Sequence, residues 1–569
     1  MKIYLEEVPF STRGSYMAFS YLKGNYRGRE VKPGLYFRTV HGDAHDSLTA
    51  RIYPTWEGKE IEYTYEAAPW EVTIKAQSRE ARIAFADAET FLIQGNLPLT
   101  FDFMSQGREF TFVQPYKSGE REFYMINAFI QKCRYMIWEK TGNLKISQNW
   151  KVSTSEYCMI TLGEKENETY MAVIEENKAD WSDRKKVFSY HETVLKQREE
   201  FESFRDSMPS IPEAFAEAAE TAAYVNWASI VKPWGILRRE AMFMSKNWMC
   251  NVWSWDHCFN AIAMAYKNPK EAWDQFMLMF DFQSETGRIP DSVNDVEIVN
   301  NYCKPPIHGW TLRKLEQIME ISREQLLEAY EKIGKWTNWW LNNRDENGDG
   351  LCEYTHGNDS GWDNSTAFSE LPPITSPDLA AFLVLQMDVL SETAENLGLL
   401  VESEMWKCRA ENMLKRMLET LFKDGLPRVL AGFDMKEVKT ESLLLYLPIV
   451  LGERLPKEIR ENLIGVLKGE KFNTMYGLAT ESPQSPEYEA DGYWRGPIWA
   501  PSTMLILDGM AKCKELEYVK AVTEKFCRMV QKSGCAENFD ALTGDGLRDR
   551  AYTWTASAML VMAHEYLME

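Results

Sequence analysis

Residues 190–208 read YHETVLKQREEFESFRDSM, and the periodicity of the chain changes at this stretch. Charged side chains recur here on a helical period, which indicates a solvated helix. Ser210 follows between two prolines, a pattern typical of a helix N-cap with proline in the first turn. We therefore expect a linker helix over residues 186–209 that separates two domains of different class.

The chain before this linker alternates with period two. Val72, Ile74 and Ala76 lie between polar residues, and Met171 and Val173 belong to another short run of this kind. Turn-forming residues separate the runs. Residues 1–185 are therefore predicted to form an N-terminal β-sandwich domain.

The chain after the linker follows the 3.6-residue period of helices. With 569 residues the protein is too long for a single core, and about a dozen helices in antiparallel pairs would close a toroid. We expect a multidomain, mainly α protein whose residues 210–569 form a C-terminal (α/α)6 catalytic domain. The helices are expected to begin near Ile211, Trp253, Pro269, Gly309, Arg323, Ser376, Val401, Thr440, Lys457, Pro497, Glu515 and Arg550.

Composition narrows the possible partners. The net charge of −21 disfavours nucleic acids and anionic membranes, because their phosphates would be repelled. The sequence has no apolar run long enough to span a bilayer and no signal-peptide core at its start, so we expect a cytoplasmic protein. Its ten cysteines form no CxxC pair, which favours reduced thiols. The composition is compatible with a small, neutral carbohydrate substrate. The sequence does not determine the oligomeric state.

Two acidic loops carry the chemistry that we predict. Asp363 follows Trp362 in a run of small and turn-forming residues, and Glu537 opens a second polar loop far downstream. Glycoside hydrolysis needs one carboxyl to donate a proton and one to handle water or the sugar carbon. We predict Asp363 as the general acid, with its pKa raised by apolar neighbours, and Glu537 as its partner. Asp359 is the competing acid in the first loop, and a helix N-cap is the structural alternative for Asp363.

Aromatic and polar residues near these loops are predicted to bind the sugar. Indole rings stack on the C–H face of sugars, although many of the 20 tryptophans must also pack the core. Arg495 offers a planar donor fork, or an ion pair with Glu487, Glu489 or Asp491. The predicted substrate-binding residues are Trp253, Trp255, Asp256, Gln283, Trp362, Tyr493, Trp494, Arg495 and Trp499.

No cofactor is expected to be required. Asp345, Asn347 and Asp349 resemble the start of a calcium loop, but the twelfth position holds His356 instead of glutamate. A structural calcium ion or a tight polar turn would both explain the pattern. GxSxG, HExxH and Walker motifs are absent from the sequence.

Five motifs in order resemble glycoside hydrolase family 63. They are residues 253–256 (WSWD), 304–306 (KPP), 360–365 (SGWDNS), 493–499 (YWRGPIW) and 537–539 (ENF). The trehalases of family 37 share a similar Ser-Gly-Trp-Asp motif. The resemblance covers about residues 210 to 569.

The resemblance to family 63 implies an (α/α)6 barrel and an inverting mechanism. It implies that Asp363 is the acid and Glu537 the base, and that Asp256 and Trp255 line the first sugar subsite. Residues 493–495 match the loop that closes this subsite. The family motif usually continues with proline after Asp-Asn-Ser, whereas Thr366 follows here. The contacts of the aglycone, and with them the substrate, stay open.

We therefore expect an inverting, exo-acting α-glycosidase, in particular an α-glucosidase that acts on a small α-linked oligosaccharide or glycoside. One alternative is an inverting disaccharide phosphorylase, in which phosphate replaces water. A carboxylate at position 537 speaks against it, because this charge repels phosphate. The other alternative is a carbohydrate-binding protein without catalytic activity.

Overall fold

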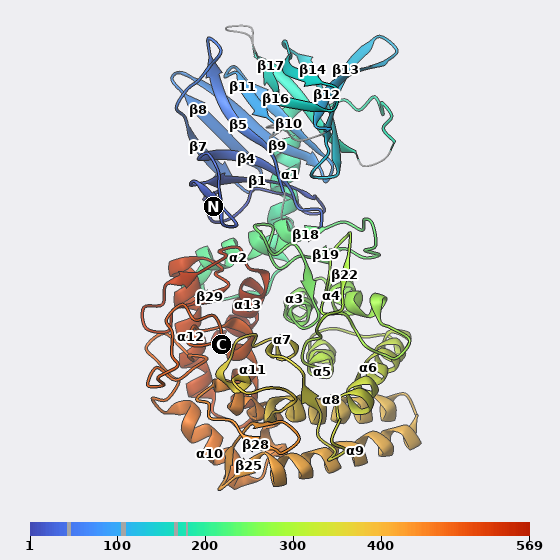
Figure 1. Ribbon diagram of the computed structural model, residues 1–569, viewed down its shortest axis with the longest axis vertical. Helices are drawn as coiled ribbons and strands as arrows, with labels where there is room; N and C mark the ends of the chain where they lie inside the picture. The colour runs from blue at the N-terminus through green and yellow to red at the C-terminus, as the bar shows by residue number, and fades with distance from the viewer. Residues whose placement is uncertain (43–46, 104–109, 164–168, 178–179, 569) are drawn as a thin grey trace.

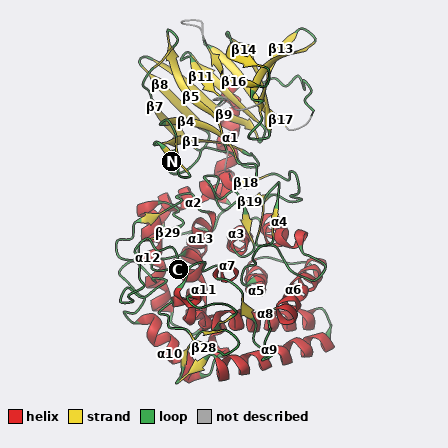
Figure 2. Cartoon of the chain, viewed as in Figure 1, coloured by secondary structure: helices red, strands yellow, loops and turns green. Residues whose placement is uncertain are grey.

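The computed structural model describes residues 1–42, 47–103, 110–163, 169–177 and 180–568. Strands fill one end of the molecule and helices the other, and α1 (Tyr190–Asp206) runs between them (Figure 1). Figure 2 shows the same division by secondary structure. The predicted β-rich N-terminal part and helical C-terminal part are thus confirmed.

The N-terminal part consists of two antiparallel sheets. The first has the order β1 (Met17–Leu22), β4 (Gly34–Thr39), β5 (Leu48–Trp56), β11 (Leu99–Asp102), β16 (Thr154–Leu162) and β15 (Lys145–Lys151), with β6 (Lys59–Glu60) beside β5. The second has the order β12 (Phe112–Ser118), β13 (Arg121–Ala128), β14 (Cys133–Thr141), β17 (Tyr170–Asn177), β10 (Thr90–Gly95), β9 (Arg79–Asp87), β8 (Glu71–Ala76) and β7 (Thr64–Ala68). A short hairpin joins β2 (Asn25–Tyr26) and β3 (Arg29–Glu30).

The two sheets share one apolar core because alternate residues point inward. Val72 and Ile74 of β8 are fully buried, as the period-two pattern predicts. Phe37 from the first sheet contacts Phe91 from the second, with ring centroids 5.1 Å apart. This face-to-face packing is the arrangement of a β-sandwich.

The helix α1 begins where the sequence changes its period. Ser189 caps its N-terminus by accepting a hydrogen bond from the backbone of Glu192. Phe201 and Phe204 are its buried aromatic residues, together with Tyr190, so this charged helix rests on the core with one face.

The helical part has twelve longer helical segments among its described residues, each beginning within a few residues of its expected position. They are α2 (Ala216–Ser229), α3 (Asp256–Ala265), α4 (Pro269–Met277), α5 (His308–Ile318), α6 (Arg323–Asn343), α8 (Pro377–Asn396), α9 (Leu400–Thr420), η4 (Leu443–Arg454), α10 (Lys457–Lys468), α11 (Ala500–Lys512), α12 (Leu516–Ser533) and α13 (Thr553–Leu567). Segment η4 is a 3-10 helix that contains Pro448, and Gly452 interrupts it with φ 54°. Proline there removes a backbone donor that an α-helix needs.

Short elements lie in the connections of the helical part. The 3-10 turns are η1 (Glu213–Phe215), η2 (Leu278–Phe282) and η3 (Thr366–Phe368), and α7 (Gly357–Ser360) is a single turn. The strands are β18 (Ile230–Val231), β19 (Ala241–Met242), β20 (Val252–Trp253), β21 (Ser292–Val293), β22 (Ile298–Val299), β23 (Glu353–Tyr354), β24 (Ile374–Thr375), β25 (Phe422–Lys423), β26 (Leu426–Pro427), β27 (Leu430–Ala431), β28 (Lys436–Glu437), β29 (Asn538–Phe539) and β30 (Gly546–Leu547).

An inner set of helices contacts in a closed sequence. The order is α3, α5, α8, η4, α11, α13 and back to α3. Every residue of α3 is buried, whereas α12 buries only one side. The difference explains why α3 lacks a polar stripe and α12 has one. Within the described residues, no helix is long and apolar enough to cross a membrane.

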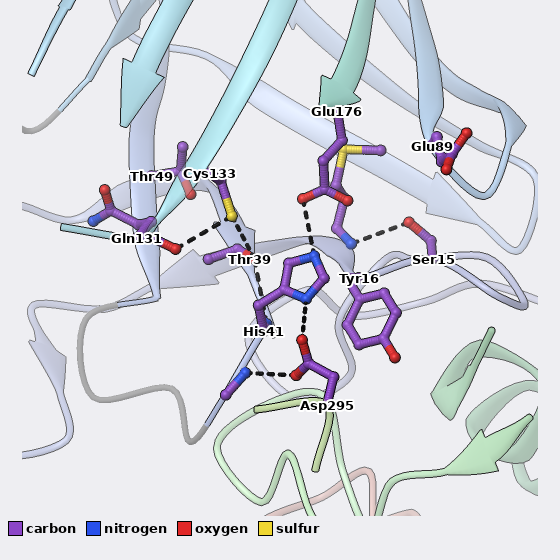
Figure 3. A network of polar contacts seen from close by, with 12 residues as sticks. Ser15, Tyr16, Thr39, His41, Thr49, Glu89, Gln131, Cys133, Glu176 and Asp295 are labelled. Carbon is purple, nitrogen blue, oxygen red and sulfur yellow. Dashed lines mark hydrogen bonds and ion pairs between the residues drawn. The ribbon is translucent and has the colours of Figure 1, made fainter. Parts of the chain in front are cut away.

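A buried polar network joins the two halves of the molecule (Figure 3). His41 of the β-rich half places Nδ1 2.7 Å from Oδ2 of Asp295, which belongs to the helical half. The other ring nitrogen lies 3.4 Å from a carboxylate oxygen of Glu176. Tyr16 stacks on the imidazole with its centroid 4.0 Å away. The junction is therefore specified by charge and by ring packing together.

Candidate active site

The loop that carries Asp363 is built against the core by two glycines. Gly361 follows α7 with φ 74°, and a Cβ atom there would lie 2.5 Å from the ring of Trp255. A Cβ atom on Gly357 would lie 2.3 Å from the carbonyl oxygen of Asp363. Only glycine allows these approaches, so the glycines fix where the loop passes.

Asn364 holds this loop to a second one. Its Nδ2 donates to the carbonyl of Gly492 at 2.9 Å, and its Oδ1 accepts from the backbone of Trp494 at 2.9 Å. Asp363, which precedes it, is half-buried. Burial raises the pKa of Asp363 and Lys304 opposes the shift. A carboxyl with a raised pKa can carry a proton near neutral pH.

Asp359, the competing acid, has a structural role. Its side chain is fully buried. One oxygen accepts from the backbone of Cys303 at 3.0 Å, and the other accepts from the backbone and hydroxyl of Thr355 at 3.0 and 2.7 Å. Arg344 lies 3.3 Å away as a counter-ion. Both oxygens of Asp359 are thus engaged in holding the loop, and Asp363 stays the predicted acid of this segment.

Glu537 lies just before β29 and is almost completely buried. Its backbone N–H donates to the carbonyl of Asp549 at 2.7 Å. Burial, and next the negative charge of Asp549, raise the pKa of Glu537 to about 8, while Arg548 and a hydrogen bond with Tyr493 lower it. Its Oε1 has no hydrogen-bond partner among the described residues. An acceptor is therefore left for a ligand or for water.

Tyr493 connects the candidate carboxyls. Its pKa is raised by burial first and then by the charges of Glu537, Asp363 and Asp256. All three groups thus lie within electrostatic range of one phenol. Tyr493 also has φ 65°, a backbone conformation that non-glycine residues adopt at a cost. Both predicted catalytic acids therefore influence the pKa of this one residue through their charges.

Asp256 is the first residue of α3 and one of its oxygens, Oδ2, lacks a hydrogen-bond partner among the described residues. Burial raises its pKa well above the ordinary value, and Lys304 opposes this shift. A buried, unsatisfied acceptor beside the candidate acids is suited to a sugar hydroxyl. This placement agrees with the predicted subsite role.

Lys304 is a site residue whose role was not predicted from the sequence. It is buried, with Nζ 3.0 Å from Oδ1 of Asp291 and 2.7 Å from the carbonyl of Asn358. Its charge acts on both Asp363 and Asp256. The sequence feature that marks this residue is a lysine followed by two prolines. Such a rigid loop suits a cation that balances several buried carboxyls.

The predicted tryptophans form a packed aromatic cluster. Trp494 stacks on Trp499 with centroids 4.0 Å apart and planes at 6°, and Trp362 lies 4.7 Å from Trp494. Trp255, Trp362, Trp494 and Trp499 are all at most 2% exposed, while Trp253 is half-buried. Four of these rings are therefore covered by protein and pack against one another or against neighbouring residues, as core side chains do.

The remaining predicted residues lie in different surroundings. Gln283 donates both amide hydrogens to backbone, to the carbonyls of Gly287 and Lys332 at 2.9 Å each, and so holds its own loop. Arg495 pairs with Glu487 and Glu489. Of the two roles considered for Arg495, a sugar contact or an ion pair, the structure therefore shows the ion pair.

The calcium-like segment closes on itself. Oδ1 of Asn347 accepts from the backbone of Asp349, and Oδ2 of Asp345 accepts from the backbone of Gly350. These bonds describe the tight polar turn, and the calcium ion stays a prediction.

A pocket of about 250 Å³ opens beside Asp363. Glu537 is not among the residues that line it. The lining side chains with functional interest are those of His356, Asp363, Phe368, Glu370, Glu487 and Arg495.

Comparisons with known proteins agree with the motifs. Residues 249–555 match the family described as mannosylglycerate hydrolase MGH1-like glycoside hydrolase domain. The mannosylglycerate hydrolase MGH1 of Selaginella moellendorffii is 21% identical over 388 residues, which cover 54% of this chain and 79% of that protein. The glucosylglycerate hydrolase of Mycolicibacterium hassiacum is 22% identical over 411 residues, covering 54% and 91%.

Two solved structures show similar folds. The GH63 mannosylglycerate hydrolase of Thermus thermophilus, in complex with Tris and D-glycerate, has a TM-score of 0.51 and 19% identity over 61% of this chain and 98% of that chain. A bacterial glucoamylase complexed with acarbose has a TM-score of 0.61 and 11% identity, and covers 99% of this chain and 94% of that one. The second likeness includes the β-rich part.

Proposed function

Because the chain belongs to the MGH1-like glycoside hydrolase family, a group related to family 63, we propose that it is an inverting, exo-acting α-glycosidase. Asp363 protonates the glycosidic oxygen and Glu537 takes a proton from the attacking water. The observation that carries the proposal is that both carboxyls, from distant loops, lie around Tyr493 with raised pKa values.

The architecture that we propose for this reaction is an (α/α)6 toroid over residues 210–569. The closed sequence of contacts among six inner helical segments supports it. Residues 1–185 then form a separate sandwich domain, and residues 186–209 the linker. Alternate loops of such a toroid gather at one mouth, which is where we place the substrate.

The substrate that we propose is a small α-linked glucoside, and no cofactor is required for its hydrolysis. Asp256 and Tyr493 contact the first sugar, since both combine burial with polar atoms beside the acids. The curated relatives named above are hydrolases of mannosylglycerate and glucosylglycerate. The name of the second includes a glucosyl unit, which agrees with this choice.

Phosphorolysis is less compatible with the charges at the site. Three carboxyls surround Tyr493, and the only buried cation among the described neighbours of Asp363 is Lys304, which is paired with Asp291. Arg548 also acts on Tyr493 and Glu537, but this arginine is exposed and paired with Asp491. A phosphate dianion in place of water would therefore meet a predominantly negative site.

The reaction is tested by following an α-glucosyl disaccharide by NMR from the first minutes of hydrolysis. We expect the β-anomer of the released sugar to appear first. Release of the α-anomer would overturn the inverting mechanism.

The roles of the two acids are tested by Asp363→Asn and Glu537→Gln. Each should lower kcat by about 10²–10⁴-fold, the usual contribution of a general acid or base, and leave the melting temperature nearly unchanged. Glu461→Gln, an exposed carboxylate of α10 paired with Lys457, is the matched control and should keep full activity. Full activity in either site variant would remove that residue from the mechanism. Sugar binding without any hydrolysis by the unmodified protein would instead identify a carbohydrate-binding protein.

A further inference from the structure

The pocket beside Asp363 lies on the side where the leaving group departs. In an inverting reaction the acid faces the glycosidic oxygen, and the base faces the opposite side of the sugar carbon. The pocket is lined by Asp363 and not by Glu537, so it lies on the acid side. This assignment rests on the proposed function. It makes the lining of the pocket the part of the chain that selects the aglycone.

The charges of this lining are predominantly negative. Glu370 and Glu487 line the pocket beside Asp363, with Arg495 as the one arginine or lysine among the lining residues. Arg495 is already engaged, because its guanidinium lies 2.8 Å from Glu489 and 3.4 Å from Glu487. It also donates to the backbone carbonyl of Glu487 at 3.2 Å.

A further carboxyl stands behind the wall of the pocket. The hydroxyl of Thr366, a lining residue, donates to Glu481 at 2.7 Å, and Glu481 is fully buried. The nearby lysines are also engaged: Lys304 pairs with Asp291 and Lys436 with Glu370. Each of these described cations is thus already paired with a carboxylate.

Apolar side chains also line the pocket. Phe368, Pro372 and Ile374 contribute to its lining. The ring of His356, which also lines the pocket, stacks on Tyr302 at 4.9 Å. Sugar rings combine hydroxyls with a C–H face, so a lining that contains both carboxylates and apolar groups suits them. The volume of about 250 Å³ is small for a ligand site and suits one sugar unit.

We propose that this pocket accepts an uncharged sugar as the leaving group and rejects a carboxylate such as that of glyceric acid. The chain would thereby differ in aglycone from the relatives whose names contain glycerate. Glu370 and Glu487 are the residues that set this choice, by hydrogen bonding to hydroxyls and by repelling an anion.

The first test compares kcat/KM for α-glucosyl-glucose disaccharides and for α-glucosylglycerate with the same protein. We expect the best disaccharide to exceed the glycerate by at least about tenfold, the scale of a like-charge contact. Added salt should raise the rate for the glycerate and leave that for the disaccharide unchanged, because both glutamates are partly exposed and therefore screened. Equal or better hydrolysis of the glycerate would overturn the inference and leave the glycosidase intact.

The second test uses Glu370→Gln combined with Glu487→Gln. Removing both charges should raise kcat/KM for the glycerate relative to the disaccharide by about tenfold. Glu461→Gln combined with Glu458→Gln removes two exposed charges of α10 instead and should leave the ratio unchanged. An unchanged ratio in the pocket variant would also overturn the inference. If neither substrate is hydrolysed by the unmodified protein, the proposed function fails and this inference fails with it.

Discussion

At the scale of single residues, the site depends on how each carboxyl is surrounded. Asp549 is fully buried, and its Oδ1 accepts from Asn247 at 2.8 Å and from the backbone of Ala551 at 2.9 Å. Its charge raises the pKa of Glu537. Since the proposed base Glu537 can accept a proton only when it is ionised, activity should fall as the pH falls through this raised pKa of about 8.

Asp549→Asn should move this acidic limb of kcat/KM to lower pH, because the amide oxygen keeps both acceptor bonds and the charge is lost. The measurement is a pH profile of kcat/KM from about pH 4 to pH 10 for both proteins, a range that spans the ordinary and the raised pKa of a carboxyl. Asp545→Asn, in the same loop but exposed, is the control and should leave the limb in place. A limb that does not move in Asp549→Asn would show that Asp549 does not tune the base.

At the scale of elements, the turn after α7 determines where the acid lies. Gly361 has φ 74° and would place a Cβ atom 2.5 Å from Trp255, whereas Gly398 after α8 has φ 81° and nothing within 4 Å. Gly361→Ala and Gly398→Ala therefore share the backbone strain of about 1–3 kcal/mol, and only the first adds a clash. We expect the melting temperature to fall further for Gly361→Ala than for Gly398→Ala, and kcat to fall only for Gly361→Ala. Equal losses in both variants would contradict a positioning role for the contact with Trp255.

At the scale of the whole molecule, the junction between the two halves should respond to pH. Burial lowers the pKa of His41, but Glu176 and Asp295 outweigh it and raise the pKa above the ordinary value. The junction then contributes its full stability below about pH 6.5, the ordinary histidine pKa, and loses it as the pH rises through the raised pKa.

Melting temperatures from about pH 5.5 to pH 9 test this expectation, because the range begins below the ordinary histidine pKa and extends above it. The unmodified protein should lose stability with rising pH over this window, and His41→Gln should show a smaller loss. His191→Gln, an exposed histidine of α1, should behave like the unmodified protein. The same slope in all three proteins would exclude His41 as the source.

Local patterns were sufficient to predict the two classes of structure and the approximate starts of the helices. Val72 and Ile74 alternate with polar residues, and apolar residues after Ser210 recur with the period of a helix. Such periodicity depends only on neighbouring residues and predicts whether a segment forms a strand or a helix. The motifs around Asp363 and Glu537 also indicated a family 63 glycosidase. A catalytic loop needs particular residue types at fixed positions, and these can be read from the sequence.

The role of each polar residue, in contrast, became clear only from contacts between distant segments. Asp359 and Asp363 lie in one loop, yet Arg344 and Cys303 satisfy the first, and Asn364 ties the second to a loop 128 residues away. Local patterns likewise could not predict that Lys304 pairs with Asp291 or that Trp494 is buried. Burial and electrostatic neighbours set the pKa of a side chain, and the folded chain supplies both from segments far apart in sequence.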